Sequence, residues 1–387
     1  MLRRLAAALL SFSALLVAQT NPEPIVIGER VEVPSNVLGE RRTIHIGKPQ
    51  GYEEGDKRYP VVYLLDGGKE AFHHVSGILN FLQVAGRAPG MLLVGIPNTN
   101  RTRDLTPPTH AERGQRLFPK AGGADYFLQF ISDELMPWIE DKYRTRPYKV
   151  LIGHSLGGLF AIHSLTSRPE VFNAYIAIDS SMWWSEQGLV AQAEAFFSKK
   201  KRLELDFYYT MTAEGGGAAS GSRKLAGILE EKSPVGFRWN LARMAGEDHI
   251  SIVHRSVYNG LETIFDGWYL QDPYERYKLG GLEAVHKHFE EGGKRYGYDR
   301  ETSPFVLSLI VAGLIQDGLL SEAGEVLLHD RERYPRPWNQ LEALARNYLE
   351  RNNSERAIHY FKLALEANPD SSSAKEALAK LGDENSQ

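Results

Sequence analysis

The sequence predicts an α/β protein in which a mostly parallel, doubly wound sheet is followed by a small all-α region. From residue 24 to 270, short β-branched or apolar runs alternate with longer helical patterns, as in sheets whose parallel strands are joined by helices. After Trp268 the strand pattern stops and helical periodicity takes over. A chain of 387 residues is long enough for one large domain with an appendage.

Eight runs in the first part have the length and composition of strands. The first two have no helical pattern between them, so we expect an antiparallel edge, with the remaining strands parallel. Residues 101–123 are rich in proline, glycine and charge without a clear period, and we expect a long loop over one end of the sheet. The candidate strands are Ile25–Val33, Thr43–Ile46, Val61–Leu65, Leu92–Ile96, Lys149–Ile152, Ala174–Ile178, Leu205–Met211 and Arg238–Met244.

The all-α region repeats one pattern at an interval of 34 residues, the length of a tetratricopeptide repeat. We expect a helical linker over residues 271–303, and then two such repeats with a capping helix, Ser373–Leu381, over residues 304–383. The repeats are a candidate surface for a protein or peptide partner, and a plain helical bundle is the alternative. The matching positions are Leu341, Leu344, Ala345, Tyr348, Ala357, Phe361 and Pro369, and 34 residues earlier Leu307, Ile310, Val311, Leu314, Ala323, Leu327 and Pro335.

The N-terminus has the pattern of a secretory signal peptide. Arg3 and Arg4 precede the largely apolar run Leu5–Val17, and polar residues resume at Gln19. The run is too short to span a bilayer comfortably, so we expect a signal peptide over residues 1–19 and an exported protein, periplasmic or secreted. A retained membrane anchor is the alternative.

Composition excludes several classes of chemistry. The chain has no cysteine, which rules out a thiol nucleophile, a disulfide framework and a cysteine-bound zinc. Its 45 Lys and Arg against 49 Asp and Glu are too balanced for a general attraction to nucleic acid or anionic membranes. The phosphate-binding loop G-x-x-x-x-G-K-[ST] and the zinc motif H-E-x-x-H are absent from the sequence, and we expect no metal or organic cofactor.

The candidate chemistry centres on Ser155. The strand Lys149–Ile152 runs directly into Gly153–Gly158, which reads G-H-S-L-G-G, and the helical stretch 159–167 follows. This strand, G-x-S-x-G and helix context is that of a nucleophile elbow, in which glycines relieve crowding at a strained turn and leave the serine hydroxyl exposed. We therefore predict Ser155 as a catalytic nucleophile.

A serine nucleophile needs a general base, and His249 is the candidate because it follows the last strand in the run Gly246–His249 and precedes a helix. The acid that would orient the imidazole is open. Glu214 follows the seventh strand and is the first choice, Asp179 follows the sixth strand and is an alternative, Asp248 is a weaker candidate, and a serine and histidine dyad is a further one.

Acyl transfer also needs donors for the oxyanion that forms on the substrate. The backbone N–H of Leu156 is one candidate, and the second is expected from the loop after the third strand, at Gly67 or Gly68. An ordinary turn at Asp66–Gly68 is the alternative.

Several blocks resemble the esterase D family of α/β-hydrolases over about residues 25–270. That resemblance implies an α/β-hydrolase fold, Ser155 as nucleophile, His249 as general base, and Gly67 and Gly68 as part of an oxyanion hole. Some siderophore esterases of the family use a dyad, so the resemblance leaves Glu214 open. The blocks are Tyr59–Gly67, Asn98 with Arg101–Pro107, Gly153–Gly158, Asp179–Trp184 and Gly246–His249.

The chain departs from the family where many relatives have Ser-Pro-Ser before paired tryptophans, since it has Asp179–Ser181. This change places a carboxylate, Asp179, where it could orient the imidazole instead of Glu214. We expect Trp183 and Trp184 to wall the pocket, with core packing as the alternative, and Arg101 to bind an acidic substrate, with an ion pair to Asp104 as the alternative.

The sequence-based hypothesis is therefore an exported serine hydrolase that cleaves a small-molecule carboxylic ester through an acyl-enzyme, similar to siderophore, feruloyl or acetyl esterases. The competing hypothesis is an inactive hydrolase-fold binding protein whose helical repeats recruit a partner. Nucleic acid and a membrane span in the mature protein are not expected.

Overall fold

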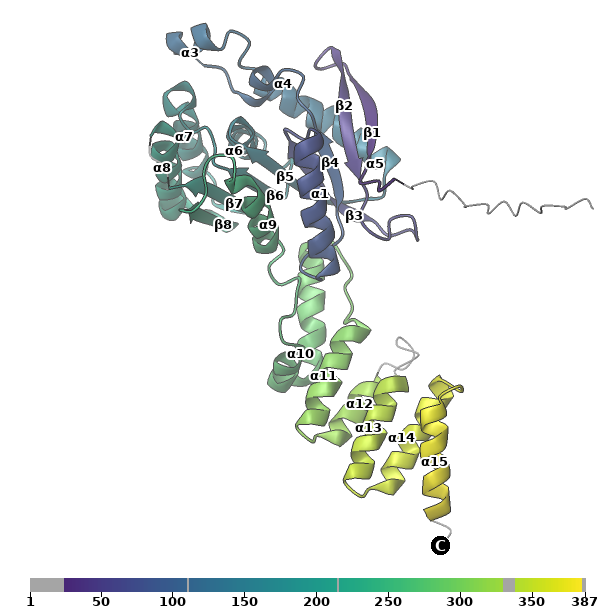
Figure 1. Ribbon diagram of the computed structural model, residues 1–387. Helices are drawn as coiled ribbons and strands as arrows, with labels where there is room; N and C mark the ends of the chain where they lie inside the picture. Colours follow the sequence, from purple (N-terminus) through teal and green to yellow (C-terminus); the bar gives the residue numbers. More distant parts are fainter. Residues whose placement is uncertain (1–23, 110, 214–215, 330–337, 385–387) are drawn as a thin grey trace, which may run out of the picture.

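The computed structural model describes residues 24–109, 111–213, 216–329 and 338–384, which form a sheet domain and a helical arm that extends away from it (Figure 1). We call residues 24–269 the sheet domain and residues 273–384 the arm. The predicted signal peptide, Glu214 and Pro335 lie outside the described residues, so the predictions that rest on them stay predictions.

Within the described residues the sheet has eight strands, in the spatial order β1-β2-β4-β3-β5-β6-β7-β8. β2 is antiparallel to both β1 and β4, and the remaining neighbours are parallel, so the predicted antiparallel edge is confirmed. The strands are β1 (Glu29–Ser35), β2 (Glu40–Gly47), β3 (Tyr59–Leu65), β4 (Leu92–Ile96), β5 (Thr145–His154), β6 (Ala174–Ile178), β7 (Arg202–Thr212) and β8 (Val235–Met244).

Helices cover both faces of the sheet, because alternate residues of its central strands are apolar and point to opposite sides. Val61 and Tyr63 belong to one buried cluster with residues of α4 to α8, and Val62 belongs to a second cluster with α1 and α9. The helices are α1 (Lys69–Val84), α4 (Ala124–Gln129), the π-helical turn η1 (Phe130–Leu135), α5 (Met136–Lys142), α6 (Leu156–Ser167), α7 (Trp184–Phe197), α8 (Gly217–Lys232) and α9 (Ile252–Ile264).

The segment predicted as a long loop contains two short helices, α2 (Arg101–Leu105) and α3 (Glu112–Leu117). The Asn100 side chain caps α2 by accepting a hydrogen bond from the Arg103 N–H at 3.1 Å. The prediction was wrong on this point because helices of five and six residues are shorter than two turns, too short to show a period.

The arm consists of α10 (Pro273–Arg295), α11 (Pro304–Gln316), α12 (Leu320–His329), α13 (Trp338–Glu350), α14 (Ser354–Ala367) and α15 (Ser372–Glu384). α10 is broken at Gly280 and Gly281, where Gly281 has φ 65°. The apolar positions that match the repeat pattern are buried in one cluster, and α15 packs beside α14. A paired, helical build agrees with the expectation, while the identity of the repeats as tetratricopeptide repeats stays a prediction.

The arm joins the sheet domain at the amino-terminal edge of the strands. Arg295 at the end of α10 donates to Asp206 at 2.8 Å, and Arg238 of β8 donates to the same carboxylate oxygen at 2.6 Å. Burial raises the pKa of Asp206 to about 6, against the opposing effect of Arg238. The guanidinium of Arg300 lies 3.6 Å from the centre of the Trp268 ring.

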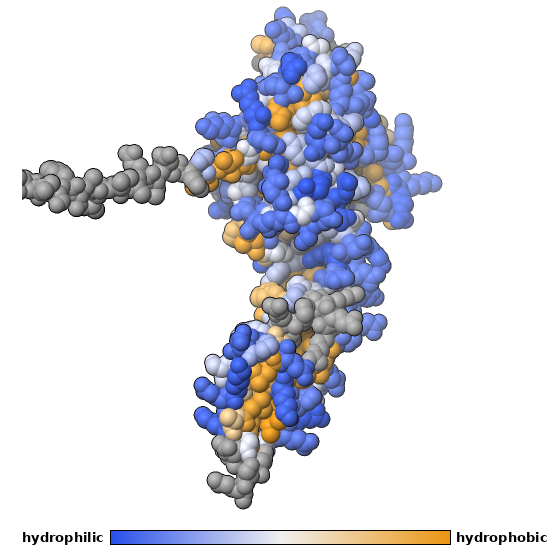
Figure 2. All heavy atoms as spheres, turned by 90° about the vertical axis from the view of Figure 1, so that its right-hand side faces the viewer, coloured by the Kyte–Doolittle hydropathy of each residue, from blue (hydrophilic) through white to orange (hydrophobic). Residues whose placement is uncertain are grey.

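The surface of the arm differs from that of the sheet domain. Figure 2 shows a band of apolar residues, bordered by hydrophilic ones, on the lower part of the molecule formed by the C-terminal helices. Among the residues that the structure describes, no helix is both long and apolar enough to cross a membrane.

Candidate active site

Ser155 lies at a strained turn between β5 and α6. Its backbone angles, φ 59° and ψ −112°, fall in a region that residues other than glycine rarely adopt. Backbone bonds from neighbouring segments hold the turn: the Ser155 N–H donates to Ile178 at 2.9 Å, and its carbonyl accepts from Ser181 at 3.0 Å. A Cβ on Gly153 would lie 2.2 Å from the carbonyl oxygen of Gly157, so this glycine is required for the turn to close.

His249 lies in the turn between β8 and α9, and its Nε2 is 3.0 Å from the Ser155 hydroxyl. Asp248 shapes that turn by accepting hydrogen bonds from the N–H groups of Ile250 at 2.8 Å and Ser251 at 2.7 Å. These backbone bonds lower the pKa of Asp248. The Asp248 carboxylate is thus used in the turn that precedes α9 and is not the partner of the imidazole.

The carboxylate beside the imidazole belongs to Asp179, at the carboxyl end of β6. Its Oδ2 is 2.6 Å from His249 Nδ1, and its Oδ1 accepts from the Thr212 N–H at 3.1 Å. The Asp179 side chain is 14% exposed and the His249 side chain 44%. Glu214, the first choice from the sequence, lies outside the described residues, and the position next to Nδ1 is taken by the alternative.

His154 is a site residue that sequence reasoning missed. Its Nε2 is 2.7 Å from the His249 carbonyl oxygen, so the Nε2–H donates there, and the two rings lie 4.5 Å apart. Burial, and secondarily the neighbouring His249, lower the pKa of His154, which keeps its imidazole neutral near pH 7. A histidine two residues after the apolar run Val150–Ile152 was the available signal.

The two glycines proposed for the oxyanion hole differ in their roles. The Gly67 N–H donates to the Ile96 carbonyl at 3.0 Å, and a Cβ there would lie 2.4 Å from the Ile96 nitrogen. Gly67 therefore packs against β4 and its amide is occupied, which corrects the expectation that it binds an oxyanion. The Gly68 N–H makes a contact of 2.7 Å with the Asp66 carbonyl within a three-residue turn.

The predicted substrate-binding residues also separate. Arg101 forms an ion pair with Asp66 at 2.7 Å, neither free in the pocket nor paired with Asp104. Trp184 is buried and donates its indole N–H to Pro107, so the packing alternative describes it. Trp183 is 43% exposed and remains the tryptophan available to a ligand.

No group of three or more His, Asp or Glu side chains able to hold a metal ion is found in the part of the chain that the structure describes. The site is therefore described by its hydroxyl, imidazole and carboxylate groups and by the backbone amides around them.

Known proteins resemble this chain in sequence and in architecture. Residues 35–213 match the family described as "Putative esterase". The ferri-bacillibactin esterase of Bacillus subtilis is 30% identical over 242 residues, which are 55% of this chain and 82% of that protein. The chain belongs to this esterase family. The siderophore triacetylfusarinine C esterase of Aspergillus fumigatus is 27% identical over 287 residues, 64% of this chain and 96% of that protein.

The fold of this esterase is that of the α/β-hydrolases. A crystal structure of an IroE-like serine hydrolase from Shewanella oneidensis aligns with a TM-score of 0.66 at 28% identity, covering 77% of this chain and 97% of that one. Membership of the family makes the protein an ester hydrolase. The fold class and the family resemblance predicted from the sequence are thereby confirmed.

Proposed function

We propose that this esterase is a serine hydrolase that cleaves siderophore-type carboxylic esters through an acyl-enzyme intermediate. The observation that carries the proposal is the unbroken row from Asp179 to His249 to Ser155, with contacts of 2.6 Å and 3.0 Å. Such a row activates a hydroxyl that is otherwise a weak nucleophile at neutral pH. The named activities of the Bacillus and Aspergillus relatives support the substrate class.

In this mechanism the Ser155 hydroxyl attacks the ester carbonyl and passes its proton to His249 Nε2. Asp179 accepts the Nδ1–H, which fixes the tautomer and stabilises the imidazolium that forms. His249 then gives the proton to the departing alcohol, leaving an acyl group on Ser155. Water attacks that group by the same route in reverse, which releases the acid and restores the free serine.

The negative charge on the carbonyl oxygen needs donors during both steps. The Leu156 N–H is the first amide of α6, where a helix has no acceptor of its own and carries partial positive charge. Gly68 is the proposed second donor, and the substrate oxygen would compete with the Asp66 carbonyl for its N–H. Removing one such donor typically costs about 3 kcal/mol of transition-state stabilisation.

A fluorophosphonate probe tests the nucleophile directly. The full-length protein should be labelled, Ser155→Ala should not be, and Ser167→Ala, at the far end of the same helix, should be labelled as the wild type is. The kcat of Ser155→Ala should fall by about 10⁵-fold or more on any ester that the wild type hydrolyses. Absence of labelling in the wild type would favour the inactive binding protein instead.

A panel of esters tests the substrate class. Comparing kcat/KM for a ferric trilactone siderophore, a feruloyl ester and short acetyl esters should give the highest value for the siderophore, by at least about tenfold, or about 1.4 kcal/mol. A feruloyl or acetyl ester at the top of the ranking would reject the siderophore assignment while keeping the serine esterase.

Export and partner binding complete the proposal. We expect the N-terminal signal peptide to direct the protein to the periplasm or medium, and intact mass measurement of the exported protein should show loss of about the first 19 residues.

The apolar band of the arm supports a protein partner there. Deletion from residue 304 onward should leave hydrolysis of a small ester unchanged while abolishing capture of that partner.

A further inference from the structure

Three loops that follow β3, β4 and β5 meet at one ion pair. Arg101 donates from Nε to Asp66 Oδ1 at 2.7 Å and from Nη2 to Asp66 Oδ2 at 2.8 Å, a two-pronged contact. The same Nη2 donates to the His154 carbonyl oxygen at 3.3 Å, and Asn98 donates to Asp66 Oδ1 at 2.5 Å. The pair thus ties the turn that carries Gly68 to the elbow that carries the serine.

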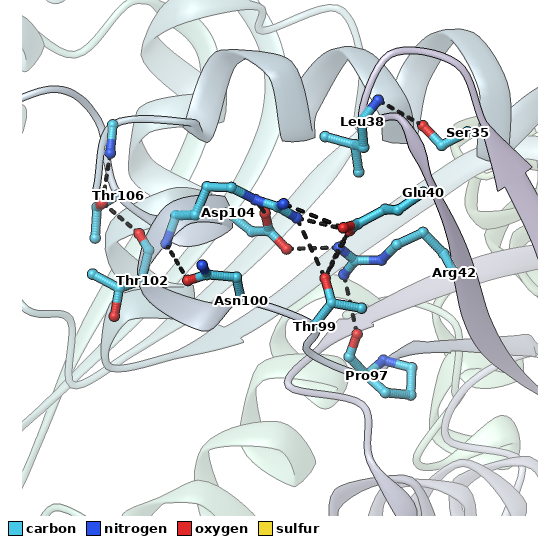
Figure 3. A network of polar contacts seen from close by, with 12 residues as sticks. Ser35, Leu38, Glu40, Arg42, Pro97, Thr99, Asn100, Thr102, Asp104 and Thr106 are labelled. Carbon is cyan, nitrogen blue, oxygen red and sulfur yellow. Dashed lines mark hydrogen bonds and ion pairs between the residues drawn. The ribbon is translucent and has the colours of Figure 1, made fainter. Parts of the chain in front are cut away.

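A second network holds α2, the helix that begins with Arg101 (Figure 3). On the other side of α2, Arg103 donates to Asp104 at 2.6 Å and to Glu40 at 2.7 Å. Asp104 is 1% exposed and also accepts from the fully buried Arg42 at 2.7 Å. These ion pairs fix α2, and with it the start of the Arg101 side chain that reaches Asp66.

The Asp66 carboxylate lies against the start of α6. A Cβ on Gly157 would be 3.4 Å from Asp66 Oδ2, so the carboxylate touches the helical turn whose first amide belongs to Leu156. A negative charge there is stabilised by the helix N-terminus in the resting protein. It would also repel the negative charge that develops on a substrate oxygen bound to the same amide.

We propose that Arg101 is a positioning residue that neutralises Asp66 and thereby keeps the oxyanion site free of an opposing charge. The inference rests on the proposed serine mechanism and goes beyond it, because it assigns Arg101 to Asp66 rather than to the substrate. Asp66 also has a structural role. Its carboxylate accepts hydrogen bonds from Arg101 and Asn98, and with φ 53° the residue forms the turn that leads to Gly68.

A double-mutant cycle on a small neutral ester, p-nitrophenyl acetate, tests this role. Arg101→Met leaves Asp66 unpaired and should lower kcat by about 100-fold, with KM within about threefold. Asp66→Asn with Arg101→Met leaves no charge and should recover kcat to within about tenfold of the wild type. Arg101→Lys keeps the charge and should lose no more than about tenfold. Arg223→Met, on the exposed face of α8, is the matched control and should have wild-type kinetics.

Three outcomes would overturn the inference. A double variant as slow as Arg101→Met alone would show that the charge of Asp66 is harmless. An Arg101→Lys variant as slow as Arg101→Met would show that a positive charge at this position does not protect the oxyanion site. An Arg101→Met variant with normal kcat on the neutral ester but raised KM for an acidic ester would make Arg101 a substrate-binding residue. Labelling of Ser155 by fluorophosphonate in each variant separates these results from failure of the serine mechanism, which would abolish labelling in the wild type.

Discussion

The two edges of the sheet are built on different principles. At the carboxyl edge Asp66, Ser155 and Asp179 have φ of 53°, 59° and 37°. Each of the three directly follows the carboxyl end of a strand, and the other described non-glycine residues of the sheet domain with a left-handed φ lie together in the first turn of α7. At the amino edge, the joint with the arm consists of aromatic rings and of ion pairs that two partly exposed arginines form with the buried Asp206.

The comparison shows that the sheet has its strained, candidate catalytic residues at the carboxyl edge and its attachment to the arm at the amino edge. Strain of this kind costs about 1 to 3 kcal/mol per residue and persists only where neighbours hold it in place. The turn at Ser155 has such neighbours at the end of β6 and just after it. The Ser155 N–H donates to the Ile178 carbonyl, and the Ser155 carbonyl accepts from the Ser181 N–H. Variants at the carboxyl edge should therefore change rates, and variants at the amino edge should change stability.

The largest expected effect is on the row of catalytic groups. Asp179→Asn should lower kcat by about 10³- to 10⁴-fold at neutral pH, because an amide favours the wrong imidazole tautomer and leaves the imidazolium without a counter-charge. KM for a small ester and the free energy of unfolding should change little. Steady-state kinetics and urea unfolding measure both.

Two neighbouring variants serve as its controls. Asp248→Asn keeps an acceptor in the turn before α9 and should retain kcat within about tenfold. Glu214→Gln should be within about threefold of the wild type. Full activity of Asp179→Asn would favour a dyad, and a large loss in Glu214→Gln would restore Glu214 as the acid.

The reverse pattern is expected at the amino edge. Asp206→Ala removes the acceptor that Tyr148, Arg238 and Arg295 share and should lower the free energy of unfolding by about 2 kcal/mol, since the buried Tyr148 hydroxyl loses its partner while both arginines are partly exposed and can be hydrated. The kcat should stay within about twofold. Glu204→Gln, on the same strand but at the surface, should leave stability within about 0.5 kcal/mol. A large loss of kcat in Asp206→Ala would break the separation of the two edges.

His154 tests whether the carboxyl edge also positions the base. His154→Leu removes the donor to the His249 carbonyl and should lower kcat by about tenfold, or about 1.4 kcal/mol, as expected for one hydrogen bond that orients a reacting group. His154→Gln can place an N–H near the same point and should recover most of the loss. Equal rates for both variants would assign His154 to packing alone.

The smallest effect concerns the charges beneath α2. The hydrogen bond from Arg103 lowers the pKa of Glu40 to about 2, below its ordinary value of 4.5. Glu40 therefore adds stability above about pH 4.5, and this contribution is lost as the pH falls from 4.5 towards 2. Glu40→Gln should unfold about 1 kcal/mol more easily at pH 6. The difference should shrink by pH 3, and Glu32→Gln on the neighbouring strand should show no such change.

Much of the sheet was predictable because its signals are local. Buried parallel strands read as short apolar runs, and β4 and β6 have the bounds predicted for them. The proximity of Ser155 and His249 was predictable because a strand, G-x-S-x-G and helix context and a histidine after the last strand each fix a place at the carboxyl edge, while their catalytic roles stay a prediction.

The acid was harder to predict because several carboxylates end strands at the same edge. Asp179 and Glu214 follow β6 and β7, whose backbones run only about 4.8 Å apart, so sequence order alone does not decide which side chain reaches Nδ1. The partner of Arg101 was missed for a related reason. Asp104 is near in sequence, but Asp66, 35 residues away, is near in space.

The position of the arm has a consequence for how a large substrate would be handled. Because Arg295 and Arg300 attach the arm at the amino edge, the carboxyl edge with Ser155 faces away from it. If the protein were attached to a surface through α15, at the far end of the arm, the approach of a substrate to Ser155 would stay unobstructed. An immobilised molecule could thus keep turning over bulky esters delivered from solution.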